Sequence, residues 1–190
     1  MNFKKALGSG SINNKYGFQA GAKWFNTFGL KNLIIQAEYN QVRPYTYSHE
    51  DALQSYTNYN QPLAHPLGSN FRELVGFIDY RYRRLYTEIQ VNYAKYGADT
   101  NNSDWGSDIF YSDARAELGD NSVGNKLAQG LSTKQLYSSI RVGYMFNPKY
   151  HLCIESGLSV RNLSNTMTNQ KSTTIWIDLR TNLFNEYFDF

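Results

Sequence analysis

The chain has 190 residues, and its formal net charge is only +3. It contains 16 Tyr, 11 Phe and 3 Trp, yet its mean hydropathy is polar, at −0.57. The small charge and the scattered basic residues argue against a nucleic-acid-binding protein. The single cysteine, Cys153, excludes an intrachain disulfide and a cysteine-based zinc site.

Seven segments place apolar residues at every second position. In chain order they are 16–24, 33–40, 73–82, 85–93, 139–146, 152–161 and 175–183. Each is about 10 residues long, as in tilted strands that cross a bilayer, whereas strands of soluble proteins average about 5–6 residues. No run approaches the roughly 18 apolar residues of a membrane helix. The pattern therefore predicts β-strands with one apolar and one polar face.

The predicted connections alternate in length. Short ones are expected at 27–32, 83–84 and 147–149, and long ones near 44–70, 97–133 and 162–172. Outer-membrane barrels have short periplasmic turns and long extracellular loops. Aromatic residues flank both kinds of connection, as they do at membrane interfaces. They are Trp24, Tyr80, Tyr82, Tyr144 and Phe146 beside the short turns, and Tyr39, Tyr93 and Tyr96 beside the long loops.

The polar faces carry charges of both signs. The acids are Glu38, Asp79, Glu88, Glu155 and Asp178, and the bases are Lys23, Arg81, Arg141, Arg161 and Arg180. We expect them to pair across neighbouring strands inside a plugged or narrow barrel, although any barrel interior needs polar residues. Val75, Phe77 and Trp176 interrupt the polar faces. They either fill the interior or mark a slip in the predicted register.

These features predict an all-β fold, an antiparallel transmembrane β-barrel of the bacterial outer membrane. Such barrels have even strand numbers, and an export signal needs an apolar stretch that is not found after residues 1–7. We therefore expect residues 1–190 to be the C-terminal part of one barrel domain, with about seven strands. The terminal Phe190 resembles the signal that the barrel-insertion machinery reads.

Four stretches carry a resemblance to a known family. They are EYNQVRPYTYSH at 38–49, QPLAHPLGSNF at 61–71, GNKLAQG at 124–130 and LRTNLFNEYFDF at 179–190. Together they resemble the Bacteroidetes branch of the Wzi-type capsule assembly family, which includes RemB-like proteins named for gliding motility. The resemblance spans nearly the whole chain but only the C-terminal part of the family's length. It implies a monomeric barrel that associates with capsular or other surface polysaccharide. The alternative that it implies is a structural or adhesion role in gliding motility.

The first long loop holds the candidate glycan site. Rings stack on sugar faces, and histidines supply directional hydrogen bonds. The candidate residues are Tyr45, Tyr47, His49, Tyr56, Tyr59 and His65. The alternative is that these rings pack against one another and close the mouth of the barrel.

Two other sites are weaker alternatives. His65, Ser69 and Asn70 could suggest a lipid hydrolase of the outer membrane, but their spacing does not fit one, and we expect no enzyme and no cofactor. The second long loop is rich in acids and amides, which could bind calcium. These residues are Asp99, Asn101, Asn102, Asp104, Asp108, Asp113 and Asp120. Their spacing matches no calcium-binding loop, so we expect no metal site and interpret the loop as a solvated acidic one.

Overall fold

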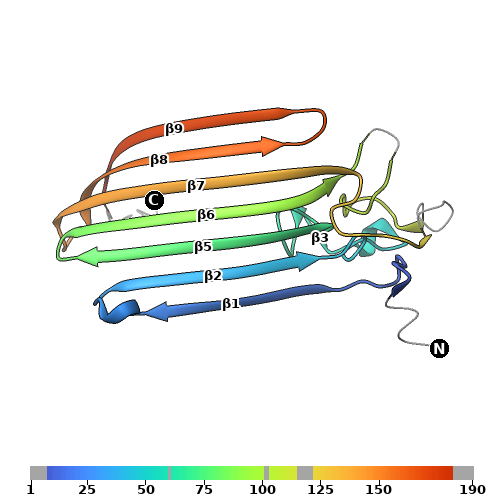
Figure 1. The fold of residues 1–190 in the computed structure, drawn as a ribbon, viewed down its shortest axis with the longest axis horizontal. Helices are drawn as coiled ribbons and strands as arrows, with labels where there is room; N and C mark the ends of the chain where they lie inside the picture. Colours follow the sequence, from blue (N-terminus) through green and yellow to red (C-terminus); the bar gives the residue numbers. More distant parts are fainter. Residues whose placement is uncertain (1–7, 60, 101–102, 115–121, 182–190) are drawn as a thin grey trace, which may run out of the picture.

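A computed structural model describes residues 8–59, 61–100, 103–114 and 122–181 of the chain. Seven long strands form one antiparallel sheet in the order β1-β2-β5-β6-β7-β8-β9 (Figure 1). They are β1 (Gly17–Phe25), β2 (Leu33–Val42), β5 (Phe71–Tyr82), β6 (Leu85–Ala98), β7 (Leu131–Asn147), β8 (Leu152–Ser164) and β9 (Asn169–Arg180). Two-residue strands β3 (Thr57–Asn58) and β4 (Gln61–Pro62) form a separate small hairpin, and two short 3-10 helices are η1 (Thr27–Gly29) and η2 (Ala52–Gln54).

Neighbours in the large sheet are consecutive long strands of the chain. The sheet is open, because no pairing joins β1 to β9 among the described residues. The all-β antiparallel architecture is thus confirmed, whereas closure into a barrel is not seen. No helix of the described residues is long and apolar enough to cross a membrane.

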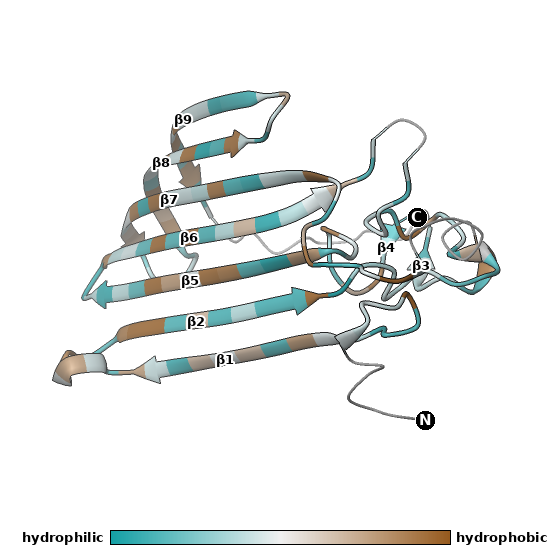
Figure 2. Ribbon diagram, turned by 45° about the vertical axis from the view of Figure 1, so that its right-hand side comes forward, coloured by the Kyte–Doolittle hydropathy of each residue, from teal (hydrophilic) through white to brown (hydrophobic). Residues whose placement is uncertain are grey.

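The two faces of the sheet differ sharply. One cross-strand row runs through all seven strands and contains only large apolar residues: Trp24, Ile35, Ile78, Ile89, Ile140, Leu158 and Ile175. We call this side the apolar face. The adjacent row, from Lys23 through Gln36 and Gln90 to Thr174, belongs to the opposite side, which we call the charged face. Figure 2 shows apolar and polar residues alternating along the strands.

The predicted interruptions do not shift the register. Val75 and Phe77 pair in step with Glu38 and Gln36 and lie on the charged face. The ring of Trp176 covers Gly157, its cross-strand partner on β8. These apolar side chains therefore fill space on the charged face. Tyr96 also lies on the charged face, because it follows Tyr93 by three residues, an odd number, and successive side chains of a strand alternate between faces. It therefore does not lie on the same face as the predicted interface aromatics such as Tyr93.

The connections agree with the predicted alternation except for the last one. Short turns at 26–32, 83–84 and 148–151 lie at one end of the sheet, and the connections 43–70 and 99–130 lie at the other (Figure 1). The expected long loop at 162–172 is wrong, because only residues 165–168 separate β8 from β9. Both strands extend through the polar residues at their ends, where the backbone ladder continues from Arg161–Ser172 to Ser164–Asn169.

Most of the buried core lies in and beside the loops, and little of it on the sheet. Ile12, Tyr45, Phe71 and Ile109 are almost completely buried at the end of the sheet where the long connections lie. In contrast, many large apolar side chains of the apolar face are exposed, and Ile175 on β9 is 74% exposed. The chain therefore buries residues of its loops and leaves the apolar face of its sheet exposed, whereas an ordinary soluble β-sheet protein buries one face of its sheet.

Candidate functional site

Three segments fold together over the end of the sheet. They are the N-terminal residues 8–16 and the two long connections. Ile12 donates its N–H to the carbonyl of Ser122, at 3.1 Å, and Ser112 Oγ donates to the carbonyl of Glu50, at 2.5 Å. Lys15 forms an ion pair with Asp113 and also donates from Nζ to the carbonyl of Ser48, at 2.8 Å. We call this assembly the loop cap.

Tyr45 is the centre of the loop cap. It is 0% exposed, and its hydroxyl donates to the carbonyl of Asp104, at 2.7 Å. Its backbone N–H donates to the carbonyl of Gly106, at 3.0 Å. Gly106 has a φ of +73°, and a Cβ there would lie 2.7 Å from the Tyr45 ring, so this position requires glycine. Tyr45 is a packing residue in this conformation and is not available to stack on a sugar.

Three of the predicted residues meet in one groove. Tyr47, His49 and Tyr56 line a cavity of about 400 Å³ together with Lys15, Thr46, Ser48 and Gln54. The rings of Tyr47 and Tyr56 are 5.9 Å apart at an angle of 33°. Tyr56 remains 54% exposed, so one ring face is accessible. The groove therefore combines exposed aromatic surface with amide, imidazole and ammonium donors, the mixture that recognises sugars.

The Tyr47 hydroxyl stays protonated well above neutral pH. Burial raises the pKa of Tyr47 above its ordinary value, and the neighbouring Tyr56 raises the pKa further. A protonated phenol both donates and accepts a hydrogen bond. It can therefore bind a sugar hydroxyl in either role.

The remaining two predicted residues lie outside this groove. Tyr59 is 93% exposed in the turn between β3 and β4. His65 stacks on Phe71, with ring centroids 4.3 Å apart, and its Nε2 lies 2.9 Å from Glu73 Oε2. Its Nδ1 accepts the N–H of Leu67, at 3.1 Å, which leaves Nε2 as the donor. Nε2 of His65 thus anchors the loop to the charged face, and Nδ1 holds the backbone of the loop itself at Leu67.

The residues of the suggested hydrolase do not form a catalytic relay. Ser69 Oγ is buried and donates to the carbonyl of Gly106, at 2.6 Å. Asn70 Nδ2 donates to the carbonyls of Gly97 and Gln129, at 3.2 and 3.0 Å. No hydrogen bond joins His65 to Ser69 in the described parts of the chain. These polar groups hold the two long connections together.

The acidic residues of the second connection organise its backbone. Asp99 accepts the N–H groups of Trp105, Ser107 and Asp108, at 2.5, 3.2 and 2.8 Å. Asp113 faces Lys15. The described residues contain no group of three or more His, Cys, Asp or Glu that could hold a metal ion. Asn101, Asn102 and Asp120 lie outside the described residues.

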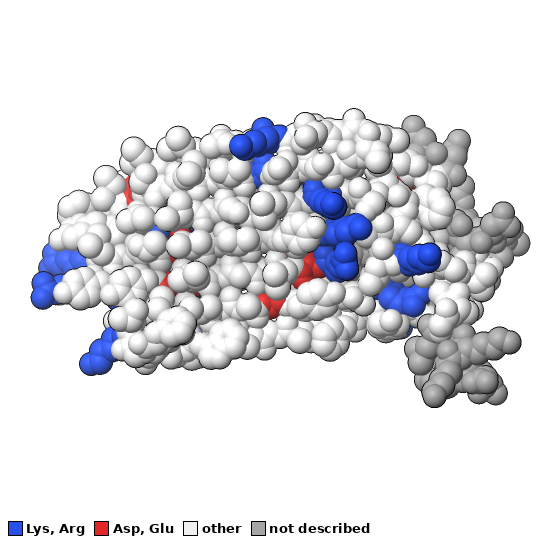
Figure 3. Space-filling view, viewed as in Figure 1, with Lys and Arg blue, Asp and Glu red and all other residues white. Residues whose placement is uncertain are grey.

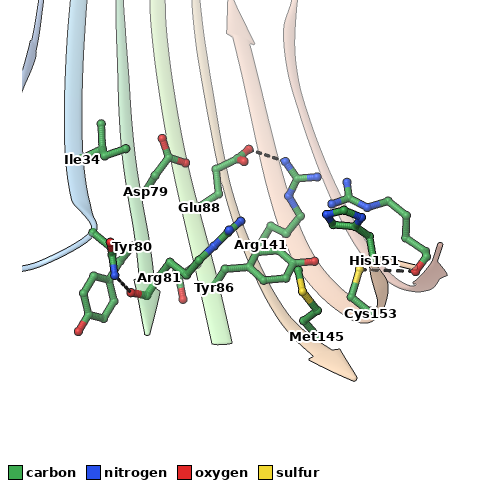
Figure 4. Close-up of a pocket in the computed structure, with 13 residues that line it drawn as sticks. Ile34, Asp79, Tyr80, Arg81, Tyr86, Glu88, Arg141, Met145, His151 and Cys153 are labelled. Carbon is green, nitrogen blue, oxygen red and sulfur yellow. Dashed lines mark hydrogen bonds and ion pairs between the residues drawn. The ribbon is translucent and has the colours of Figure 1, made fainter. Parts of the chain in front are cut away.

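A chain of charges crosses four strands on the charged face. Arg141 on β7 lies 2.6 Å from Glu88 on β6 and 3.6 Å from Glu155 on β8, and Arg180 on β9 lies 3.0 Å from Glu155. The predicted cross-strand pairing is thus confirmed for these four residues. Tyr86 donates its hydroxyl to Glu155. Figure 4 shows Glu88 and Arg141 pointing toward each other within a hollow of about 530 Å³.

Comparison with protein-family models, curated proteins and solved structures found no significant match. The candidate site is therefore defined by its geometry alone. Reasoning from sequence missed four members of the groove, Lys15, Thr46, Ser48 and Gln54. Lys15 reaches it from before β1, and no local pattern in the sequence links it to the first long connection. Thr46, Ser48 and Gln54 lie within the ring-rich stretch 45–59, and that position was the only signal for them.

Proposed function

We propose that the chain is part of an outer-membrane β-barrel and that its loop cap associates with surface polysaccharide. The observation that carries the proposal is the apolar row across all seven strands. Soluble proteins seldom expose a contiguous apolar surface of this extent, because water makes it unfavourable. Lipid acyl chains would cover it without cost.

The dimensions of the apolar face suit a membrane. On β6 this face is uncharged from Leu85 to Tyr93, which is roughly 27 Å along the strand at about 3.4 Å per residue. Leu85–Tyr93 is nine residues long, within the roughly 9–11 residues that a tilted transmembrane strand needs. The exposed rings of Tyr82 and Tyr144 lie near one end of the face, and Tyr93 lies near the other. Aromatic side chains are favoured at both membrane interfaces.

The charged face of the sheet also supports the membrane proposal. Its charges are of both signs, and Glu88, Arg141, Glu155 and Arg180 form ion pairs with one another, as expected for the interior of a narrow or plugged barrel. The loop cap covers one end of the sheet, which would face the cell exterior if the short turns are periplasmic. A groove lined by Tyr47, Tyr56 and His49 at that end suits a glycan.

Arginine substitution on adjacent residues of β6 tests the membrane proposal. Ile89 belongs to the apolar face, and Gln90 belongs to the charged face. In a membrane, Ile89→Arg should lower the stability of the inserted protein by roughly 2–4 kcal/mol, and Gln90→Arg should lower it much less. The measurement is urea unfolding of the full chain in lipid vesicles. If both substitutions had the same small effect, the apolar face would not contact lipid, and the membrane proposal would be wrong.

A further inference from the structure

All acidic residues of the seven long strands lie on the charged face, and the apolar face carries only basic ones. The charged face carries both signs: Lys23, Glu38, Glu73, Asp79, Arg81, Glu88, Arg141, Glu155, Arg161, Asp178 and Arg180. The apolar face carries only Arg72, Lys95, Lys134 and Lys171. All four are basic, and all four lie toward the loop cap. We call them the basic row.

Three members of the basic row are direct cross-strand neighbours. Arg72 on β5 pairs with Lys95 on β6, and Lys95 pairs with Lys134 on β7. Lys171 lies two strands farther, in the next row on β9. Like charges directly opposite each other on a sheet are unfavourable. An anion bound between these three residues would remove this repulsion.

The described part of the chain supplies no such anion. None of the four forms an ion pair with a described acidic residue. Arg72, Lys134 and Lys171 are exposed, and Lys95 is half-buried. Figure 3 shows Lys and Arg side chains gathered near the loop-cap ends of β5, β6 and β7, with smaller patches of Asp and Glu visible beside them and farther along the sheet.

The position of the basic row identifies its ligand. Tyr93 lies two residues before Lys95 on the same face of β6, and it pairs with Leu74 on β5, two residues after Arg72. Arg72, Lys95 and Lys134 therefore begin where the uncharged band of β5, β6 and β7 ends, whereas Lys171 on β9 lies in the same cross-strand row as Tyr93. If that band spans the acyl chains, the basic row lies at the depth of the lipid headgroups. At the opposite end of the apolar face the strands themselves carry no charge, and the basic residues there, Lys31, Arg83, Arg84 and Lys149, lie in the short turns beyond the strands.

We propose that the basic row binds the phosphate groups of a lipid headgroup in the outer leaflet. This inference rests on the proposed membrane location. Neighbouring strands are about 4.8 Å apart, so three adjacent cations span about 10 Å, enough to hold one or two phosphates. The Arg72 guanidinium can bind two oxygens of one phosphate, and the lysines add point charges. The bound lipid also removes the repulsion between the three cations.

The test uses the full chain in neutral detergent, with phosphorylated lipid A as the probe. The thermal midpoint is followed as the lipid is added, since a ligand that binds only the folded state raises it. Each basic residue near an anionic surface contributes about fivefold in affinity. The variant Arg72→Gln, Lys95→Gln, Lys134→Gln should therefore bind lipid A about a hundredfold more weakly. The control Lys31→Gln, Arg83→Gln, Lys149→Gln removes the same charge from the short turns and should bind normally.

Further measurements distinguish a lipid headgroup from other anions as the ligand of the basic row. Dephosphorylated lipid A should stabilise the wild-type chain far less than the phosphorylated form, and the binding should weaken as salt is added. An equal effect of inorganic phosphate or of an acidic polysaccharide would overturn the assignment to a lipid, and so would equal losses in both triple variants. The salt and dephosphorylation measurements need only the wild-type chain, so they decide the question even where a variant folds poorly. The Ile89→Arg substitution tests membrane contact separately. If Ile89→Arg destabilises the inserted protein but phosphorylated and dephosphorylated lipid A stabilise the chain equally, only the proposed phosphate binding fails and the membrane proposal stands.

Discussion

The ring of Tyr86 on β6 lies directly over Gly143, its cross-strand partner on β7. A Cβ built on Gly143 would lie 2.2 Å from Cζ of the ring. This close approach lets the Tyr86 hydroxyl reach across β7 to Glu155 on β8. The glycine thus makes room for an aromatic side chain that ties three strands together on the charged face.

Gly143→Ala should destabilise the chain, because the added methyl group must displace the Tyr86 ring. Overpacking of this kind costs about 1–3 kcal/mol. Gly76→Ala is the matched control: Gly76 is also a strand glycine, and a Cβ there would approach no atom closer than 3.9 Å. Urea unfolding should separate the two variants. Equal stabilities would mean that the ring does not occupy this position.

Glu155 should matter more than Glu88, although both face Arg141. Glu155 is 2% exposed and faces Arg180 as well, whereas the Glu88 side chain is 37% exposed. Glu155→Gln leaves two guanidinium groups without a buried counter-charge, which we expect to cost about 1–3 kcal/mol because both arginines stay partly solvated. Glu88→Gln should cost less than about 1 kcal/mol. The free energy of unfolding measures both, and the reverse order would refute this account of the network.

The sequence was sufficient to predict the sheet but not the loop cap. Strand faces follow from period-2 alternation, which is local, so even Phe77 and Trp176 keep their register. The end of β8 was misjudged because the ladder continues past the apolar residues to Ser164. Burial of Tyr45 depends on a contact with Gly106, far away in the sequence. Long-range contacts between loops leave no periodic signal, so the groove could be predicted only as a ring-rich stretch.

Cysteine labelling should reveal the orientation. Leu53 in the first long connection and Arg84 in the turn between β5 and β6 are both exposed and lie at opposite ends of the sheet. We expect Leu53→Cys to react with an impermeant maleimide on intact cells and Arg84→Cys to react only after lysis. The native Cys153 is buried, and the chain without an added cysteine measures its background. Labelling of Arg84→Cys alone on intact cells would invert the topology.

The groove between Tyr47 and Tyr56 should bind polysaccharide through its rings. Stacking removes the apolar face of a sugar from water, whereas sugar hydroxyls only exchange one hydrogen-bond partner for another. Replacing both tyrosines by Ala should therefore weaken capsule retention about tenfold or more, at an unchanged amount of folded protein. His49→Ala should alter sugar preference more than total binding, because an imidazole supplies a directional hydrogen bond.

Tyr150→Ala is the matched control for this experiment, since Tyr150 is 57% exposed in the turn between β7 and β8, at the opposite end of the sheet. It removes a similar ring without touching the groove and should retain capsule normally. The competing interpretation is that Tyr47 and Tyr56 only close the mouth of the barrel. In that case retention would fall in step with the amount of folded protein, and the barrel would become leaky. Retention per folded molecule decides between the two: a ratio equal to that of Tyr150→Ala would exclude the groove as a glycan site.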